Sequence, residues 1–219
     1  MHVPGHPPAS AIVLAGGQSR RLGRDKRRLR LWGAAGPTLL EHTVATVAAL
    51  CADVVVVLND PESWPGLPAR LVGDAYPGTG PLGGIASGLA AVAEPFALVV
   101  ACDMPLLSPS VLTAMLAHPR SYDLLVPRSL AGGGRNAEGI EPLHAIYSRA
   151  CLAPMEAAIA AGRLQLSALL PELRVAYVEP ALLARLDPAG HTFLNLNTPE
   201  QLAHLERLLA SPAPADRVG

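Results

Sequence analysis

The 219-residue sequence predicts a single α/β domain built on a mostly parallel β-sheet. Short apolar runs typical of buried strands alternate along the chain with segments that carry helix-start signals. Hydrophobic residues make up 50% of the composition, which is ample for a core, but aromatic residues only 4%, so Ala, Leu and Val must build that core. Single cores extend to roughly 250 residues, so one domain suits this length.

The first half of the chain contains four predicted strands, at 11–14, 53–58, 70–72 and 96–101. The second of these runs, DVVVVL, is apolar on both faces, which is typical of a central strand in a parallel sheet. A long loop at 15–37 separates the first strand from a helix predicted to run to about Leu50. That helix starts with a capping box, in which Thr38 is the N-cap and Glu41 the third helical residue. A small-residue helix is expected at 84–93.

The second half continues the alternation. Ser108 and Pro109 predict an N-cap and first helical position, for a helix to about 117. Further strands are expected at 123–126 and 174–178, and 141–147 could form another. Helices are expected at 148–161 and 165–170, and a second capping box at 198–201 starts one that ends near 209. We expect a flexible leader at 1–10, the domain at 11–210 and a disordered tail at 211–219.

Charge and cysteine usage narrow the class of protein. The net charge of −1 argues against a general nucleic-acid or membrane-surface binder. No apolar run approaches the ~20 residues that span a bilayer, and the N-terminus lacks the apolar core of a signal peptide. Three separated cysteines without CxxC spacing predict neither a disulfide framework nor a zinc site. We therefore expect a cytoplasmic protein with no nucleic-acid and no membrane partner.

The stretch 11–26 carries the strongest functional signal. An apolar strand runs into Gly16 and Gly17, whose bare backbone lets a ligand approach, and positive charge follows at once. Lys26, at its end, is the only lysine in the chain. An ammonium can follow a phosphate as its charge moves, whereas a planar guanidinium fits a fixed pair of oxygens. Lys26 is therefore the first candidate for a phosphate-binding residue.

Other interpretations of the basic stretch stay open. Residues 20–30 hold six arginines, Lys26 and one acid, which could form a solvated loop or a nucleic-acid patch. A patch would need interleaved aromatic residues or further basic surface, and only Trp32 is near. A site for a triphosphate and a second anionic substrate would use the same charge.

Polar residues follow the ends of the first four predicted strands, where ligands sit in open parallel sheets. Asp60, before a proline, suits a turn, and Asp74 is equally compatible with a site or a loop cap. Asp103 directly follows a fully apolar strand and has no evident cap to make, so it must be paired or hold a cation. Because Mg²⁺ takes one or two carboxylates together with phosphates and waters, Asp103 is the predicted metal ligand.

Two further patterns carry less weight. Residues 78–83 match GxGxxG, but residues 74–77 intervene after the preceding strand and Pro81 would break the helix start, so a dinucleotide site is rejected. We expect instead a base- or ribose-contacting loop that caps a helix at Gly84. His144 lies beside apolar residues, where a histidine is more often a hydrogen-bonded wall residue. Ser19, Ser87 and the cysteines have no partner base, so no covalent catalysis is inferred.

Five motifs, in order, resemble those of the molybdenum cofactor guanylyltransferase family, in the MobA-like nucleotidyltransferase group. The resemblance spans about residues 11–209; the first motif alone marks the wider superfamily, whereas all five are specific. The motifs are LAGGxSxRLGxDK at 14–26, GPLGGI at 80–85, CDMP at 102–105, EPLHAIY at 141–147 and NLNTPE at 195–200.

The resemblance implies a single-domain, three-layer Rossmann-like fold and transfer of GMP from GTP to molybdopterin, with release of pyrophosphate and Mg²⁺ as cofactor. Apo-molybdoenzymes or other cofactor-biosynthesis proteins are the implied protein partners. The candidate catalytic residues are Lys26, Asp103 and Arg21. The candidate nucleotide-binding residues are Leu14, Ala15, Gly16, Gly17, Lys26, Asn59, Asp74, Gly80 and Asp103. Asn195, Asn197 and His144 are the candidates for contact with the second substrate.

One departure from the family pattern leaves the nucleotide contact after the second strand open. A direct alignment puts Val57 where the family can have an asparagine, and Asn59 follows two residues later. Gly16 favours guanine over cytosine, because related cytidylyltransferases tend to carry Leu-Ala-Ala-Gly. The alternatives are a CTP- or GTP-dependent enzyme acting on another phosphorylated acceptor, such as a sugar or lactyl phosphate or molybdopterin with CTP, and a non-catalytic nucleotide-binding protein.

Overall fold

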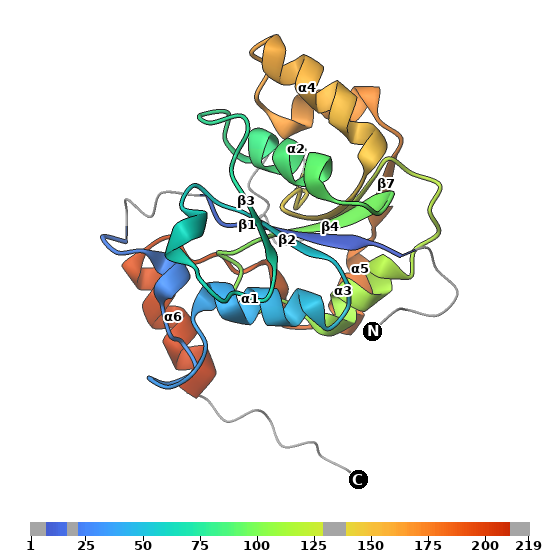
Figure 1. Ribbon diagram of the computed structural model, residues 1–219. Helices are drawn as coiled ribbons and strands as arrows, with labels where there is room; N and C mark the ends of the chain where they lie inside the picture. The colour runs from blue at the N-terminus through green and yellow to red at the C-terminus, as the bar shows by residue number, and fades with distance from the viewer. Residues whose placement is uncertain (1–7, 17–21, 129–138, 211–219) are drawn as a thin grey trace.

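The computed structural model describes residues 8–16, 22–128 and 139–210 of the chain. Their framework is a seven-stranded sheet with the strand order β3-β2-β1-β4-β6-β5-β7 (Figure 1). The strands are β1 (Ser10–Leu14), β2 (Val54–Val57), β3 (Arg70–Val72), β4 (Phe96–Ala101), β5 (Leu124–Pro127), β6 (His144–Ser148) and β7 (Val175–Val178).

The sheet is mostly parallel, as the sequence predicts. Strand β1 lies between β2 and β4 and is parallel to both, and β3 is parallel to β2. Strand β6 is antiparallel to both β4 and β5, while β7 is parallel to β5. The carboxyl ends of β1, β2, β3 and β4 therefore meet at one edge of the sheet.

Helices cover both faces of this sheet and complete three layers (Figure 1). Helices α2 (Pro81–Ala91) and α4 (Leu152–Ala160) pack on one face. The other face carries α1 (Leu39–Ala48), α3 (Pro109–Leu116), α5 (Pro180–Leu186) and α6 (Pro199–Ala210). Short 3-10 helices are η1 (Lys26–Arg28), η2 (Pro61–Ser63), η3 (Arg149–Cys151), η4 (Leu166–Glu172) and η5 (His191–Phe193). No helix in the described parts of the chain is long and apolar enough to cross a membrane.

The central strands are buried on both faces, which explains their uninterrupted apolar runs. Alternate side chains of β1, β2 and β4 enter the two hydrophobic cores on either side of the sheet. Val13, Val56 and Val100 face the α1 layer, and Ile12, Val55 and Val99 face the α2 layer. All six of these side chains are fully buried.

Most predicted elements are present with ends shifted by up to three residues; β6, for example, spans His144–Ser148 where 141–147 is predicted. Strand β1 begins at Ser10, one residue early, and α5 lies in a stretch that the sequence predicts as loop. The predicted helix at 165–170 is the 3-10 helix η4. The expected start of α2 at Gly84 is wrong: Pro81 is the first helical residue and Gly80, with φ of +67°, is the N-cap. Proline suits this position because the first helical N–H has no partner within the helix.

Both predicted capping boxes are present. Thr38 and Glu41 bond reciprocally at the start of α1, and Thr198 and Gln201 do so at the start of α6. Residues 1–7 of the predicted leader, residues 129–138 and the predicted tail at 211–219 lie outside the described residues.

Candidate functional site

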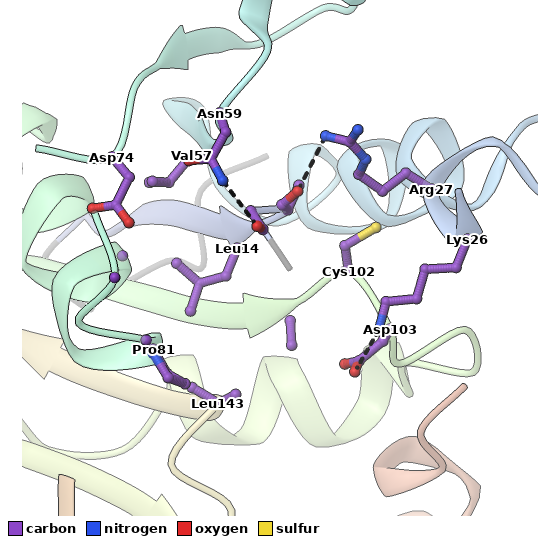
Figure 2. Close-up of a pocket in the computed structure, with 16 residues that line it drawn as sticks. Leu14, Lys26, Arg27, Val57, Asn59, Asp74, Pro81, Cys102, Asp103 and Leu143 are labelled. Atoms are coloured by element: carbon purple, nitrogen blue, oxygen red, sulfur yellow. Dashed lines mark hydrogen bonds and ion pairs between the residues drawn. The ribbon is translucent and has the colours of Figure 1, made fainter. Parts of the chain in front are cut away.

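A cavity of about 440 Å³ opens where the parallel strands β1, β2 and β4 end (Figure 2). It contains most of the polar residues that the sequence assigns to these strand ends. Its lining consists of Leu14, Ala15, Gly16, Lys26, Arg27, Val57, Asn59, Asp74, Gly78, Gly80, Pro81, Gly84, Ala101, Cys102, Asp103 and Leu143. Eight of the nine candidate nucleotide-binding residues are in this lining; the ninth, Gly17, lies outside the described residues, as does Arg21.

Lys26 and Asp103 meet on one side of the cavity. The Lys26 ammonium donates to Asp103 Oδ2 at 3.0 Å and to Asn197 Oδ1 at 2.9 Å. Both charged side chains are largely buried, with 14% and 10% of their surface exposed. The chain beyond η5 is held here because Leu196 N–H donates to the Asp103 carbonyl at 2.8 Å. The ion pair therefore joins the loop after β1, the end of β4 and the segment before α6.

The other end of the cavity carries polar groups suited to a base or sugar (Figure 2). Asn59 Nδ2 donates to the Gly16 carbonyl at 3.1 Å. Asp74 Oδ1 accepts from Tyr76 N–H at 2.9 Å and lies 3.1 Å from the Ser87 hydroxyl. Asp74 thus caps its own turn and also lines the cavity. Its position is compatible with both interpretations from the sequence, a loop cap and a site residue.

Val57 and Asn59, the two candidates for a nucleotide contact at the end of β2, present different groups to the cavity. Val57 pairs with Leu14 in the sheet and presents an apolar side chain to the cavity. Asn59 supplies the polar group there and is attached to the loop of β1 by its bond to Gly16. Of these two residues, Asn59 has the side chain that is able to hydrogen-bond in the cavity.

The arginines of the basic stretch at 20–30 that the structure describes have different partners. Arg27 lines the cavity but is paired with Asp25 and Asp60. Arg28 lies over the Trp64 ring, 4.5 Å from its centroid, and donates to the Ser63 carbonyl. Among the described residues, Lys26 and Arg27 are the cations that line the cavity. Asp60, predicted as a turn residue, precedes η2 as its N-cap and is also a partner of Arg27.

The cysteine in the lining does not suit covalent chemistry. Burial raises the pKa of the Cys102 thiol to about 12, so the reactive thiolate is suppressed at neutral pH. All three cysteines of the chain are free and buried. This agrees with the inference that the reaction uses no covalent intermediate.

The second-substrate candidates occupy different environments. Asn197 bonds to Lys26 at the edge of the cavity, whereas Asn195 donates to the Phe193 carbonyl and is not in the lining. His144 is fully buried on β6 with its ring edge-on to Phe193, and neither ring nitrogen has a hydrogen bond. Burial lowers the pKa of His144 to about 3. His144 is therefore a neutral core residue outside the cavity lining, without the hydrogen bond that the sequence led us to expect.

The donor set at Asp103 fits a magnesium ion better than a tightly caged metal. The described residues contain no group of three or more His, Cys, Asp or Glu side chains able to hold an ion. Mg²⁺ needs no such cage, since it is usually bound by one or two carboxylates, with substrate phosphates and waters completing its shell. The Asp103 carboxylate, in the lining of the cavity, meets this requirement.

Sequence reasoning missed two residues of the site. Arg27 was treated only as part of a basic run, although its neighbour Asp25 was a signal for local pairing. Ser87 was considered only as a nucleophile, whereas its buried hydroxyl contacts Asp74. Neither partnership could be inferred from spacing, because Arg27–Asp60 joins η1 to the end of β2 and Ser87–Asp74 joins α2 to the end of β3.

Comparison with known proteins places this fold and site in a family. The MobA-like NTP transferase domain matches residues 11–176. A relative from Chloroflexus aggregans named "Probable molybdenum cofactor guanylyltransferase" is 46% identical over 209 residues, covering 95% of this chain and 99% of the relative. A "Molybdenum cofactor guanylyltransferase" from Desulfosudis oleivorans is 34% identical, with 90% and 94% covered.

A solved structure gives the same result. Molybdopterin-guanine dinucleotide biosynthesis protein A from Archaeoglobus fulgidus superposes with a TM-score of 0.75 at 27% identity, covering 91% of this chain and 97% of that one. The seven-stranded sheet is thus that of a nucleotidyltransferase fold. The chain belongs to the MobA-like NTP transferase family.

Proposed function

We propose that this protein transfers GMP from GTP to molybdopterin, releasing pyrophosphate and forming the guanine dinucleotide form of the cofactor. The names of the relatives from Chloroflexus aggregans and Desulfosudis oleivorans support the reaction. The observation that carries the proposal is the pairing of Lys26 with Asp103, in a cavity that also holds the Gly16 backbone, Asn59 and Asp74.

The reaction is an in-line displacement at the α-phosphorus of GTP. An oxygen of the terminal phosphate of molybdopterin forms the new bond to that phosphorus. The bond from the α-phosphorus to the bridging oxygen breaks, and pyrophosphate leaves with the electron pair. No protein nucleophile is needed, so positioning and charge stabilisation supply the catalysis.

Lys26 is the residue that we assign to the charge on the leaving group. Its ammonium lies at the side of the cavity that follows β1, where the triphosphate would meet the glycine-rich loop. A mobile point charge suits a phosphate chain whose negative charge moves from the α–β bridge to pyrophosphate. The preorganised ammonium, held by Asp103 and Asn197, requires little rearrangement during the reaction.

Asp103 would hold Mg²⁺ together with the phosphate oxygens of the nucleotide. The ion would supply further charge neutralisation to the triphosphate. In this chain the carboxylate also orients Lys26, and its near-complete burial keeps the pair out of bulk solvent. The carboxylate would then contact both the ion and the Lys26 ammonium.

Asp74 would select the guanine base. The edge of guanine carries two neighbouring donors, the ring N1–H and the exocyclic amine, whereas an ionised carboxylate is only an acceptor. The corresponding edge of cytosine carries one donor and two acceptors, which would face the Asp74 carboxylate unfavourably. Asn59, next to Gly16, lies between the Asp74 and Lys26 sides and is suited to the ribose or the α-phosphate (Figure 2).

The direct test measures pyrophosphate release by the purified protein. GTP and CTP are compared, each with and without molybdopterin and Mg²⁺, and the dinucleotide product is identified by mass spectrometry. We expect release only with GTP, molybdopterin and Mg²⁺ together. Preferential use of CTP would contradict the base assignment, and nucleotide binding without any release would favour a non-catalytic binding protein.

A further inference from the structure

Arg27 is the most extensively bonded side chain in the wall of the cavity. Its Nε–H donates to Asp25 Oδ1 at 2.9 Å, and Nη2 donates to Asp25 Oδ2 at 2.8 Å and to Asp60 Oδ2 at 2.9 Å. Nη1 donates to Asp60 Oδ1 and to the Ala15 carbonyl, the latter at 3.3 Å. A guanidinium has five N–H donors, so these contacts occupy its whole hydrogen-bonding capacity.

The three partners of Arg27 belong to three segments that each carry a site residue. Ala15 directly precedes Gly16 at the end of β1, and Asp60 directly follows Asn59 at the end of β2. Asp25 is the N-cap of η1, directly before Lys26, and its carboxylate also accepts from Arg27 N–H at 3.0 Å. One guanidinium therefore connects the backbone around Gly16, Asn59 and Lys26.

The charges around Arg27 make it unsuited to binding phosphate itself. Two carboxylates and the Ala15 carbonyl already occupy the donors of this guanidinium, so none is left for a phosphate. Arg28 Nε also lies 3.8 Å from Asp25 Oδ2. Hydrogen bonding to Arg27 holds the pKa of Asp60 below its usual range. Burial opposes ionisation of Asp25, but the hydrogen bonds from Arg27 still lower the pKa of that carboxyl. All three groups are charged at neutral pH, with 14% of the Arg27 side chain exposed.

We propose that Arg27 is a positioning residue: it ties the loop of Lys26 to the ends of β1 and β2 and thereby sets where the Lys26 ammonium stands. This inference rests on the proposed nucleotidyl transfer, because Lys26 acts on the departing pyrophosphate in that reaction. Lys26 lies on a single 3-10 turn, η1, inside a long loop, so its backbone has little regular structure to hold it. Arg27 and the capped Asp25 supply that support.

Loss of Arg27 should move Lys26 rather than remove a phosphate ligand. Without the guanidinium, Asp25 and Asp60 repel each other across the space that it filled, and the loop loses its attachment to Ala15. A displacement of about 1 Å in a catalytic group can cost about 10²-fold in rate. The expected signature is a lower rate of chemistry that depends on the presence of Lys26.

The experiment compares Arg27→Met with Arg28→Met in single-turnover pyrophosphate release from GTP in the presence of molybdopterin and Mg²⁺. Arg28 is the matched control, because it lies on the same turn, carries the same charge and also contacts Trp64. It is 53% exposed, is not part of the cavity, and its contact with Asp25 is an ion pair at 3.8 Å. We expect about a 10²-fold lower rate for Arg27→Met and an unchanged rate for Arg28→Met. Equal rates for the two variants would overturn the proposal.

A double-mutant cycle separates positioning from a general structural role. If Arg27 acts through Lys26, adding Arg27→Met to Lys26→Met lowers the rate no further, because the group that it positions is already gone. A purely structural role would lower the rate by the same factor in both backgrounds. That second result would overturn the proposal even if the single variant is slow.

Two more variants exclude other causes. In the triple variant Arg27→Met/Asp25→Asn/Asp60→Asn, both carboxylates are neutralised along with the loss of the guanidinium. We expect the rate to stay low. Recovery of the wild-type rate would show that Arg27 only cancels charge. Arg27→Lys keeps the charge without the fork and should also be slow, and it replaces Arg27→Met if thermal unfolding shows that variant to be unfolded. The wild-type rate is measured in parallel. If the wild type releases no pyrophosphate, the proposed function fails. If the wild type is active and Arg27→Lys is equally fast, only the proposed role of Arg27 is overturned.

Discussion

Lys26 and Asp103 are 77 positions apart in the sequence, yet the ammonium lies 3.0 Å from the carboxylate. The parallel pairing of β1 with β4 explains this proximity, because Leu14 and Ala101 are register partners at the ends of the two strands. Asp103 follows β4 by two residues, and η1 returns Lys26 to the same edge of the sheet. The unique lysine of the chain and the acid that ends the β4 motif thus form one charged unit in the cavity.

Removing either member of this pair should nearly abolish turnover. We expect Lys26→Met and Asp103→Asn each to lower the rate of pyrophosphate release by about 10²- to 10³-fold, because a preorganised charge contact to the transition state is lost. The double variant should be little slower than the worse single variant, since the two side chains act as one unit. Circular dichroism and thermal unfolding check that the fold is kept. Turnover by Asp103→Asn at the wild-type rate would remove Asp103 from the mechanism.

Asp74 should control the choice of base. Asp74→Asn replaces an acceptor-only group by one that also donates, so the preference for GTP over CTP in kcat/KM should fall by about 10- to 100-fold, the value of a hydrogen bond to a charged group. Ser87→Ala removes the hydroxyl 3.1 Å from Asp74 and should lower the same ratio by a smaller factor. Ser110→Ala, on the exposed side of α3, is the control and should leave the ratio unchanged. An unaltered ratio in Asp74→Asn would place base selection elsewhere.

His144 should contribute an acid-sensitive part of the folding stability. Burial lowers its pKa to about 3 in the folded protein, against about 6.5 in an unfolded chain. Between these values the unfolded state binds a proton that the folded state does not, so stability is fully present above about pH 6.5 and falls as the pH is lowered, by up to about 1.4 kcal/mol per pH unit.

The variant His144→Phe keeps an aromatic ring beside Phe193 but cannot be protonated. Urea unfolding at pH 4.5 and 6.5 should therefore show a smaller loss of stability on acidification in the variant than in the wild type. Identical pH dependence in the two proteins would contradict a neutral buried His144.

Gly88 should be required for close packing of α2 on the sheet. A Cβ at this position would lie 2.5 Å from Cγ2 of Ile12, a fully buried residue of the central strand β1. Alanine in a helix interior normally gains up to about 1 kcal/mol over glycine, but overpacking of a core costs about 1–3 kcal/mol. We expect Gly88→Ala to lower the free energy of unfolding, and Gly73→Ala, with open space around its Cβ, to have little effect. A stabilised Gly88→Ala would show that the α2–β1 contact relaxes freely.

Local sequence signals predicted the elements whose formation is decided by neighbouring residues. The run FALVVA became β4 with its predicted limits, and the Thr38–Glu41 pair formed both bonds of its capping box. The polar residues that follow the first four strands were predicted to share one edge, and the cavity contains Gly16, Asn59, Asp74 and Asp103. This part was predictable because parallel strands bring their carboxyl ends together.

The direction of β6 and the environment of His144 depend on contacts with residues distant in the sequence, so they could not be predicted from local patterns. The direction of β6 is set by antiparallel pairing with β4 and β5, and no local pattern records which neighbours a strand will have. The burial of His144 depends on Phe193, 49 positions later in the chain. The start of α2 at Pro81 was misjudged because a proline was treated as a helix breaker where it is a favourable first residue.

The central claim is that the phosphates of GTP lie against Lys26 in the cavity after β1. Because the chain contains a single lysine, lysine labelled with ¹⁵N at the ζ position gives one side-chain NMR signal, that of Lys26. On titration with GTP and Mg²⁺ we expect this signal to shift and to saturate with the occupancy measured by calorimetry, and CTP at the same concentration to leave it in place. Saturating GTP binding with an unmoved Lys26 signal would contradict the account.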